Sequence, residues 1–387
     1  MARKLVTVRR VSAVKPIPGA DRIETAIVDG WQCVVKVDSF RPGDLGVFFE
    51  IDSFLPASDP RWAFLDAQFT TLEDARGFRV KSMKMRGQIS QGLLQPLDVF
   101  PEVKGVLEEL GRTLESREEA VKSILDLAFE EKLGVKKWER SIPGAAYGKG
   151  SILPPEQQVA MGPFPDFIER TDQERIQNLP KVFEEWGDKV FQETTKMDGS
   201  SMTVYYLRKD APMFDLLPPL NPTGGQSGVM ENGRVGVCSR NIELVEREKS
   251  FFWEVALKNN LLEKLAKLDR NIAIQGELCG STIQSNFEGF PKGFHDFYLF
   301  SVWDIDEQKH LPPRQTEQWA KDLGLKHVPV HGYTKLSDLG ASVEELLKRA
   351  EGKGMNGKKR EGIVLKHEDG VFSFKAISNS YLLKHGE

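Results

Sequence analysis

Short runs of alternating apolar and polar residues fill the first 100 positions of the chain, and this pattern predicts β-strands. Turns containing glycine and aspartate separate the runs, as at Pro18–Asp21 and Pro42–Asp44. The expected strands cover Leu5–Val11, Arg22–Val28, Gln32–Val37 and Gly46–Ile51. About five strands at this spacing predict a small closed β-barrel over residues 1–100.

The pattern changes after residue 101. Apolar residues recur near helical spacing at Val121, Ile124, Leu125 and Phe129, within a stretch that is otherwise highly charged. We therefore expect a helical insertion or connector over residues 101–145. Glycine and proline become frequent next, which predicts a linker over residues 146–164.

Strand patterns return in the C-terminal part, residues 165–387. A loop is expected at Pro218–Gly228, between two strands. The expected strands cover Lys189–Thr194, Met202–Tyr206, Ile272–Ile274, Asp296–Ile305, Glu361–Lys366 and Val371–Ile377. Together with the N-terminal barrel, they predict an α+β protein whose second domain contains an antiparallel sheet.

The stretch Lys196-Met197-Asp198-Gly199 joins two of these expected strands. A lysine amine is almost wholly protonated at neutral pH, and it becomes a nucleophile when burial or a neighbouring cation favours the neutral form. Asp198 could help to hold a divalent metal beside it. Gly199 would let the backbone turn and approach a phosphate group. The same four residues also fit an ordinary solvated turn.

Further acidic, basic and aromatic residues follow in order along the chain. Glu277 is expected at the end of a strand, and Glu361 opens a later one. An aromatic in Asp296–Ile305 could stack on a purine, although most residues of that strand are expected in the core. Arg240, Lys366 and Lys375 could contact phosphate or ribose. An activated amine, three acids for a metal and these cations fit nucleotidyl transfer from a triphosphate.

The ordered motifs resemble those of the covalent nucleotidyltransferases, which include polynucleotide ligases and mRNA capping enzymes. The stretch Gly276–Asn286 resembles the RNA ligases in particular, and Arg170–Asn178 is similar to a segment that precedes their lysine. The matching motifs are Lys196–Gly199, Ser239-Arg240, Gly276-Glu277, Phe297–Phe300, Glu361–Lys366 and Phe374-Lys375.

The resemblance implies a role for each matching residue. Lys196 would carry AMP, and Phe300 would stack on its adenine. Arg240 and Glu277 would contact the ribose. The remaining implied roles are Mg²⁺ or Mn²⁺ binding by Asp198, Glu277 and Glu361, and phosphate contacts by Lys366 and Lys375.

Two positions depart from the family pattern. Ser373 stands where many members have the first lysine of a K-x-K pair, so Lys375 would contact phosphate alone. Thr195 stands before the nucleophile, where glutamate is frequent. Both departures bear on the contacts with adenine and phosphate.

The N-terminal segment resembles the OB-fold module of tRNA-binding domains and the N-terminal domain of one RNA ligase family. The resemblance rests on Ile17–Arg22, Gly43–Asp52 and Lys84–Gly92. Four closely spaced cations favour RNA binding, because alternate residues of a strand share one face. They are Arg79, Lys81, Lys84 and Arg86. The alternative is a barrel that stiffens the enzyme or joins it to another protein.

The composition indicates the broad class of protein. The 387 residues are 40% hydrophobic and 9% aromatic, and three cysteines stand at no metal-ligand spacing. We expect a monomer without a membrane segment in a reducing compartment, the cytoplasm or the nucleus. The formal net charge of −4 does not favour a nonspecific nucleic-acid coat, so basic groups that bind RNA must be clustered.

The leading hypothesis is an ATP-dependent RNA ligase that joins 3′-OH and 5′-phosphate ends of nicked or broken RNA, in RNA repair. A DNA ligase or a capping guanylyltransferase is a neighbouring alternative, although those enzymes usually carry the OB domain after the lysine domain. The alternative from another class is a noncatalytic tRNA- or RNA-binding protein.

Overall fold

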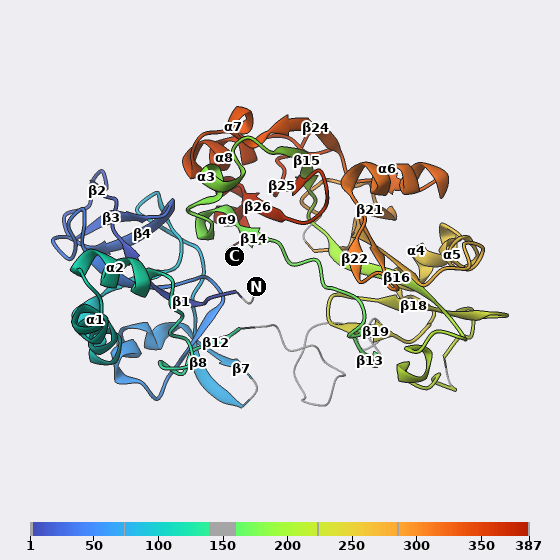
Figure 1. Ribbon diagram of the computed structural model, residues 1–387, viewed down its shortest axis with the longest axis horizontal. Coiled ribbons are helices and arrows are strands. Elements are labelled where there is room, and N and C mark those ends of the chain that lie inside the picture. Colours follow the sequence, from blue (N-terminus) through green and yellow to red (C-terminus); the bar gives the residue numbers. More distant parts are fainter. Residues whose placement is uncertain (1–2, 73, 139–159, 223, 285, 386–387) are drawn as a thin grey trace. The chain divides into compact units, whose positions relative to one another are not determined.

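The computed structural model describes residues 3–72, 74–138, 160–222, 224–284 and 286–385 (Figure 1). The chain divides into two compact units. The N-terminal unit comprises Met1–Ser141, Gln177–Pro180 and Asn379–Glu387, and the C-terminal unit comprises Ile142–Ile176 and Lys181–Ser378. Two short segments of the expected catalytic domain, 165–387, thus belong to the N-terminal unit. None of the helices in the described ranges is long and apolar enough to cross a membrane.

The N-terminal unit contains the strands that the sequence predicts. Its ladders form four separate sheets, with no continuous ring of strand pairing among the described residues, so the expected closure of the barrel is not observed. The sheets are β1 (Val6–Arg10), β5 (Leu45–Phe49) and β11 (Leu93–Pro96); β2 (Ala13–Pro16), β3 (Ile23–Val28) and β4 (Trp31–Lys36); β6 (Ser53–Pro56), β7 (Phe69–Leu72), β8 (Ala75–Arg79) and β12 (Lys136–Lys137); and β9 (Met83–Met85) with β10 (Gln88–Ser90).

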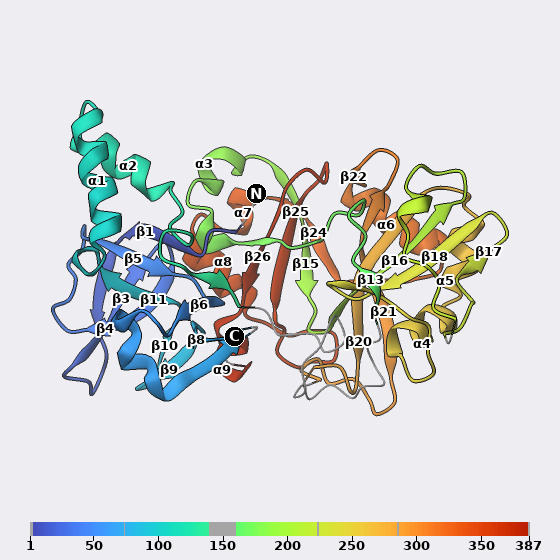
Figure 2. The same ribbon diagram turned by 90° about the horizontal axis from the view of Figure 1, so that it is seen from below.

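The expected helical segment forms two helices, α1 (Pro101–Thr113) and α2 (Arg117–Leu125), which pack side by side (Figure 2). The Ser116 hydroxyl accepts a hydrogen bond from the Glu119 N–H and caps α2. Val103 of α1 and Ile124 of α2 are buried in the same apolar cluster as Val6. The helices therefore extend the core of the N-terminal unit. Residues 139–145 of the predicted connector lie outside the described residues.

Two segments from late in the chain complete the N-terminal unit. Asn178 donates from Nδ2 to Glu50 Oε2 at 2.8 Å, and its Oδ1 accepts from Trp31 Nε1 at 3.2 Å. Glu50 and Trp31 are buried, so the asparagine helps to satisfy their polar groups, together with Arg3, which also binds Glu50 at 2.9 Å. Helix α9 (Asn379–His385) is the second segment, and Asn379 Oδ1 accepts from Gln91 Nε2 at 3.4 Å.

The C-terminal unit contains a nine-stranded sheet and a five-stranded sheet. Of the linker expected over residues 146–164, the part 146–159 lies outside the described residues, and Ala160–Pro163 forms strand β13. The nine-stranded sheet contains β13, β16 (Ser200–Arg208), β17 (Val229–Met230), β18 (Gly233–Cys238), β19 (Ile242–Leu244), β20 (Ile272–Gly280), β21 (His295–Asp304), β22 (Lys309–His310) and β23 (Lys326–His327). The five-stranded sheet contains β14 (Glu174–Arg175), β15 (Val190–Lys196), β24 (Val330–Lys335), β25 (Gly362–His367) and β26 (Ser373–Ile377).

Both faces of the nine-stranded sheet are covered. Along β16, Val204 and Tyr206 pack with Trp253 and Leu261 of helices α4 (Phe251–Lys258) and α5 (Leu261–Ala266). Tyr205, pointing the opposite way, packs in a second apolar cluster. This explains the nearly continuous apolar sequence of the central strands. The other helices are α3 (Val182–Trp186), α6 (Pro313–Asp322), α7 (Leu336–Leu339) and α8 (Val343–Ala350).

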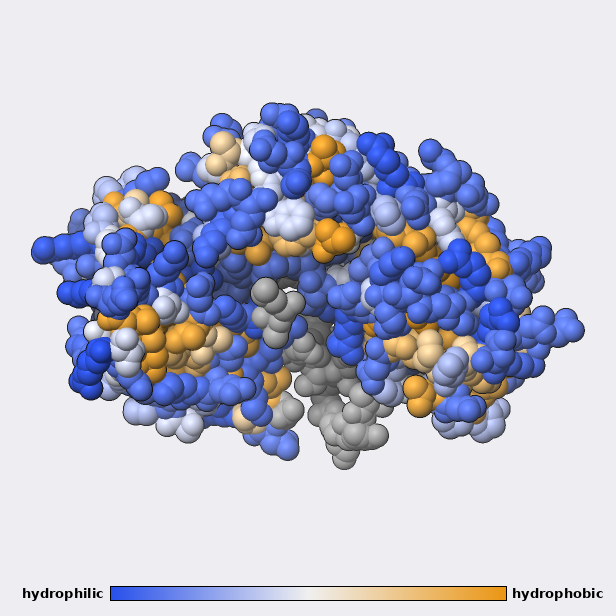
Figure 3. All heavy atoms as spheres, in the orientation of Figure 1, coloured by the Kyte–Doolittle hydropathy of each residue, from blue (hydrophilic) through white to orange (hydrophobic). Residues whose placement is uncertain are grey.

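Cys33, Cys238 and Cys279 are buried and free. On the face drawn in Figure 3, hydrophilic residues cover most of the surface of each unit, and apolar residues form scattered patches.

Candidate active site

Lys196 is the last residue of β15, and the three residues after it connect to β16. The two strands belong to different sheets, so the expected turn is also the crossing point from one sheet to the other. β15 pairs with β25 in antiparallel register, and Lys196 lies opposite Gly362, directly after Glu361. Pairing of two strands distant in sequence thus brings two of the predicted site residues together.

Lys196 Nζ forms an ion pair with Glu361 Oε1 at 2.7 Å. The glutamate side chain is 8% exposed and the lysine side chain 24%, so the amine is reachable whereas the carboxylate is nearly enclosed. Asp198 is also buried, at 8% exposure. A carboxylate at this distance stabilises the ammonium form of the lysine.

Glu277 belongs to the same electrostatic cluster. Burial raises the pKa of its carboxyl to about 8; the Lys196 charge lowers this pKa, whereas the negative charges of Glu361 and Asp198 raise it. The strand does not end at Glu277, as the sequence suggested, because pairing of β20 with β21 continues to Gly280. Carboxylates that disfavour each other's ionisation can be stabilised together by a divalent cation.

Gly199 is required for close packing. A β-carbon there would lie 2.5 Å from the Leu278 carbonyl oxygen and 2.7 Å from Glu277 Cγ. This reason differs from the sharp turn toward a phosphate that we expected from the sequence. The absence of a side chain lets the connection between β15 and β16 lie directly against the strand that carries Glu277.

The predicted cations share one face of the five-stranded sheet. Lys196 pairs with Gly362, Val364 pairs with Lys375, and Lys366 is two residues further along β25. Because side chains alternate along a strand and cross-strand partners point the same way, Lys196, Lys366 and Lys375 face the same side.

Lys366 lies beside Phe300, the predicted stacking aromatic. Its Nζ donates to the Phe300 carbonyl oxygen and lies 5.2 Å from the centre of the phenylalanine ring. Burial lowers the pKa of Lys366 to about 8. The structure therefore places Lys366 beside the ring of Phe300.

Asp172 brings together the other two predicted cations. Arg240 Nη2 lies 2.9 Å from Asp172 Oδ2, and Lys375 Nζ lies 3.6 Å from Asp172 Oδ1. Asp172 was not selected from the sequence, although it lies in the segment Arg170–Asn178 that resembles RNA ligases. Arg175 of that segment was also missed, and β14 places it opposite Lys375 of β26.

Glu288 is a fourth acid of the cluster that the sequence analysis missed. Its side chain is completely buried. Burial raises its pKa to about 7; the negative charges of Asp198 and Glu361 also raise it, whereas the backbone N–H of Asp198 lowers it. The glutamate follows the expected motif Gly276–Asn286 by two residues, and no periodicity of the sequence marks it.

The four residues predicted to bind RNA do not lie on one strand. Arg79 ends β8, Lys84 lies in β9, Lys81 lies between these strands, and Arg86 follows β9 with a φ of 50°. Arg79 is already engaged, because its Nη2 lies 2.7 Å from Asp52 Oδ1. Its guanidinium carbon also lies 4.1 Å from the centre of the Trp138 ring. The other three cations are exposed.

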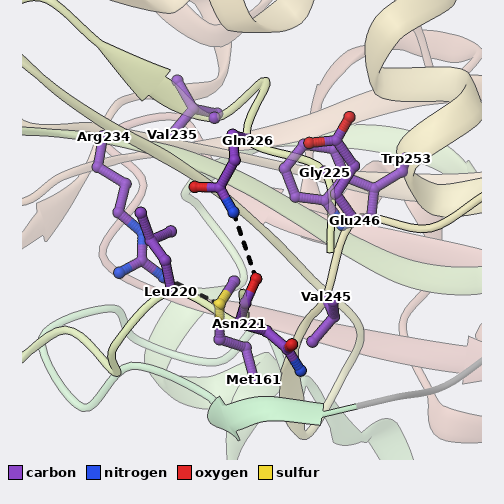
Figure 4. Close-up of a pocket in the computed structure, with 11 residues that line it drawn as sticks. Met161, Leu220, Asn221, Gly225, Gln226, Arg234, Val235, Val245, Glu246 and Trp253 are labelled. Carbon is purple, nitrogen blue, oxygen red and sulfur yellow. Dashed lines mark hydrogen bonds between the residues drawn. The ribbon is translucent and has the colours of Figure 1, made fainter. Parts of the chain in front are cut away.

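A small pocket elsewhere in the C-terminal unit contains none of the predicted site residues (Figure 4). It is lined in part by the loop Pro218–Gly228, where Gln226 Nε2 donates to the Asn221 carbonyl oxygen at 3.3 Å. Arg234 on its wall is held by Glu243 at 2.7 Å. We assign this pocket to packing of the loop between β16 and β18.

Comparison with known proteins gives the family of the chain. A family model described as an OB-fold domain matches residues 5–97, and one described as RNA ligase matches residues 189–377. An alanine variant of the Naegleria gruberi RNA ligase, solved with ATP and Mn, is 38% identical, covers 99% of both chains and has a TM-score of 0.77.

The chain belongs to the RNA ligase family. The Naegleria gruberi RNA ligase with PPi is 39% identical over 99% of both chains, with a TM-score of 0.76. A second alanine variant of that ligase, with AMP and Mn, is 38% identical over 99% of both chains, with a TM-score of 0.78. No curated protein matched this chain. The family and the two-domain fold class expected from the sequence are confirmed.

Proposed function

We propose that this RNA ligase uses ATP to join RNA 3′-OH and 5′-phosphate ends, with Lys196 as the residue that carries AMP. The observation that carries the proposal is the Lys196–Glu361 ion pair of 2.7 Å within a cluster of acids. Solved relatives that cover the whole chain hold ATP, AMP and PPi. These are the substrate of a lysine adenylylation, the group transferred and the leaving group.

The reaction has three steps. Lys196 Nζ attacks the α-phosphorus of ATP, a P–N bond forms, and the bond to the β-phosphate oxygen breaks to release pyrophosphate. An oxygen of the RNA 5′-phosphate then attacks the AMP phosphorus, which breaks the P–N bond and returns the lysine. Finally the RNA 3′-OH attacks the 5′-phosphorus, loses its proton and displaces AMP.

The acids near Lys196 are of the type that binds a divalent cation, although within the described part of the chain no three such side chains are arranged to hold one by themselves. Asp198, Glu277 and Glu361 would supply the carboxylate oxygens that Mg²⁺ and Mn²⁺ accept; burial is the main cause of the raised pKa of Glu277, and the charges of Glu361 and Asp198 add to it. When bound, the cation would offset negative charge on the phosphates and on Glu361. The amine would then lose the partner that favours its protonated form, which prepares Lys196 for attack.

The remaining predicted residues would bind the nucleotide. Phe300 would stack on adenine. Lys366, which the sequence analysis expected at phosphate, lies beside Phe300 and would therefore be nearer the adenine. Arg240 would contact the ribose together with Glu277, and Lys375 would contact phosphate. Asp172 holds Arg240 and Lys375 near one another, so the two cations are already grouped on one side of the site.

RNA is the expected partner, with nicked or broken strands as substrates and repair as the context. Lys81, Lys84 and Arg86 are exposed and are the better candidates for phosphate contacts, whereas Arg79 is engaged by Asp52. The alternative is an N-terminal unit that only supports the enzyme. We expect a monomer inside the cell, in the cytoplasm or the nucleus, since its three cysteines are free.

Incubation with ATP labelled at the α-phosphate, with Mg²⁺ or Mn²⁺, tests the proposal. A denaturing gel should show a labelled protein band, and labelled GTP should give none. RNA with a 5′-phosphate should be sealed, and the same RNA with a 5′-hydroxyl should not. Labelling by GTP alone would indicate a capping enzyme, and the absence of labelling by either nucleotide would contradict covalent catalysis.

A further inference from the structure

Strand β24 contains a β-bulge next to the nucleophile strand. Gly332 pairs with Glu193 and Val330 pairs with Thr194, so His331 is the extra residue in β24. β-Bulges redirect side chains and are frequent beside active sites. The Thr195 N–H donates to the Pro329 carbonyl oxygen at 2.9 Å, which holds the backbone next to the bulge. The bulge presents the His331 imidazole to the end of β15.

The imidazole of His331 joins two residues from different segments. Its Nε2 lies 2.9 Å from Thr195 Oγ1 and 3.0 Å from Arg360 Nη1. A guanidinium can only donate, so Nε2 must accept, and the ring is neutral with its proton on Nδ1. The Thr195 hydroxyl would then share the single lone pair of Nε2 with Arg360, in a bifurcated hydrogen bond. Only the neutral imidazole makes both contacts.

Arg360 is a fixed partner. It is 8% exposed, and its remaining donors bind carbonyl oxygens at the end of α8: Nε to Ala350 at 3.1 Å and Nη2 to Arg349 at 2.5 Å. A cation at the C-terminal end of a helix interacts favourably with the helix dipole. Arg349 in turn binds Glu193 of β15 at 2.7 Å. The contacts therefore link Thr195 of β15 through His331 and Arg360 to the end of α8, and Arg349 of α8 links back to β15.

The two residues that His331 joins have a specific place in the chain. Thr195 directly precedes Lys196, and Arg360 directly precedes Glu361. Adjacent side chains of a strand point to opposite faces, so Thr195 lies on the face of β15 opposite Lys196. We propose that His331 is a positioning residue for lysine adenylylation, which ties these two neighbours together and thereby holds Lys196 at Glu361.

This inference rests on Lys196 being the AMP-carrying residue. A displacement of about 1 Å in a reacting group can reduce a rate by about 100-fold, so a support behind the amine affects the attack on ATP. His331 is an exposed residue, and the charged groups around it are Glu193, Arg349 and Arg360. Partial burial of the ring lowers the histidine pKa, the two arginines act in the same direction, and Glu193 opposes them. A protonated His331 would direct its Nε2–H at the Arg360 guanidinium, and the hydrogen bond between these two residues would be lost.

The test compares His331→Ala, His331→Gln and the control Lys335→Ala, an exposed residue of the same strand. The rate of Lys196 adenylylation is measured in a single turnover at saturating ATP, beside sealing of pre-adenylylated RNA, which bypasses the attack by the lysine. His331→Ala should slow adenylylation about tenfold or more and change sealing of pre-adenylylated RNA less than about twofold. His331→Gln should recover most of the rate, because its amide oxygen can accept from Arg360.

Two results would overturn the proposal. One is wild-type adenylylation by His331→Ala, and the other is an equal loss in both reactions, which would mean a general structural role. If His331→Ala does not fold, Thr195→Val and Thr195→Ser give the same comparison, since only serine keeps the hydroxyl. Labelling of the wild-type protein by ATP is scored separately, so failure of the underlying function is distinguishable from failure of this inference.

Discussion

Lys196 and Glu361, which are far apart in the sequence, form a 2.7 Å ion pair because β15 and β25 pair in antiparallel register. The amine and the carboxylate are therefore in direct contact where the chain passes from one sheet to the other. A carboxylate at this distance favours the charged form of a lysine, and an amine must lose its proton before it can attack a phosphate. If the acids around it bind the metal, as proposed, they are expected to control the first step of ligation.

Removal of the Glu361 charge should therefore affect adenylylation most strongly. We expect Glu361→Gln to reduce the rate of AMP transfer to Lys196 by roughly 100-fold or more at neutral pH, with partial recovery as the metal concentration rises. Titration of Mn²⁺ against single-turnover rates measures this effect. Glu344→Gln, in the exposed first turn of α8, is the control. An unchanged metal dependence in Glu361→Gln would argue that the acid is structural.

Glu277 should lower the stability of the fold at pH 8, where its carboxyl group begins to ionise. Its pKa is raised from 4.5 to about 8, so the folded chain binds this proton more tightly than the unfolded chain. Its contribution to stability is consequently lost as pH rises from about 4.5 to about 8. Without metal, Glu277→Gln should be more stable than the wild type at pH 8, by on the order of 1 kcal/mol, and similar at pH 4.

Urea unfolding at both pH values measures this difference. A stability difference that is the same at pH 4 and pH 8 would rule out titration of Glu277 as its cause. Glu277→Gln should also lose adenylylation activity, so the gain in stability and the loss of function occur in one variant.

Gly199→Ala tests the close packing behind the nucleophile. The new β-carbon would meet the Leu278 carbonyl oxygen at 2.5 Å, and backbone atoms cannot move away as easily as a flexible side chain. We expect a loss of about 1–3 kcal/mol in stability together with slower adenylylation. Gly105→Ala in α1, where the added carbon meets nothing within 4 Å, should be neutral or stabilising. Equal thermal unfolding of both variants and the wild type would refute the packing argument.

The exposed cations of the N-terminal unit separate an RNA contact from a supporting role. Replacement of Lys81, Lys84 and Arg86 by glutamine should leave adenylylation unchanged, weaken sealing and reduce its dependence on salt, because fewer counterions are released on binding. Arg79→Gln should instead lower stability, since Arg79 pairs with Asp52 and lies on Trp138. An equal decline of adenylylation and sealing in the triple variant would favour the supporting role.

The sequence predicted local features well. Strands such as β15 and β21 follow from their apolar runs, and the turn after Lys196 follows from the short connection between two such runs, whereas the crossing from one sheet to the other does not. The ordered motifs also gave the correct family, and they selected acids and cations of which the structure brings several together around Lys196. These properties are local or ordered along the chain, and a single sequence contains them.

The remaining features depend on contacts between distant segments. The position of Glu277 within β20 depends on pairing with β21, and the bulge at His331 depends on register with β15. Asp172 and Glu288 become visible only when the fold brings them to Arg240 and to Asp198. The engagement of Arg79 by Asp52 likewise could not be read from spacing, which suggested a free basic patch.

The central claim is that Lys196 carries AMP, and mapping of the modified residue tests it most directly. Wild-type protein, Lys196→Ala and the control Lys189→Ala are incubated with ATP and metal, and their peptides are analysed by mass spectrometry. One AMP should be found on Lys196 in the wild type and in Lys189→Ala, and none in Lys196→Ala, which should still seal pre-adenylylated RNA to some extent. AMP on another residue, or undiminished modification of Lys196→Ala, would contradict the account.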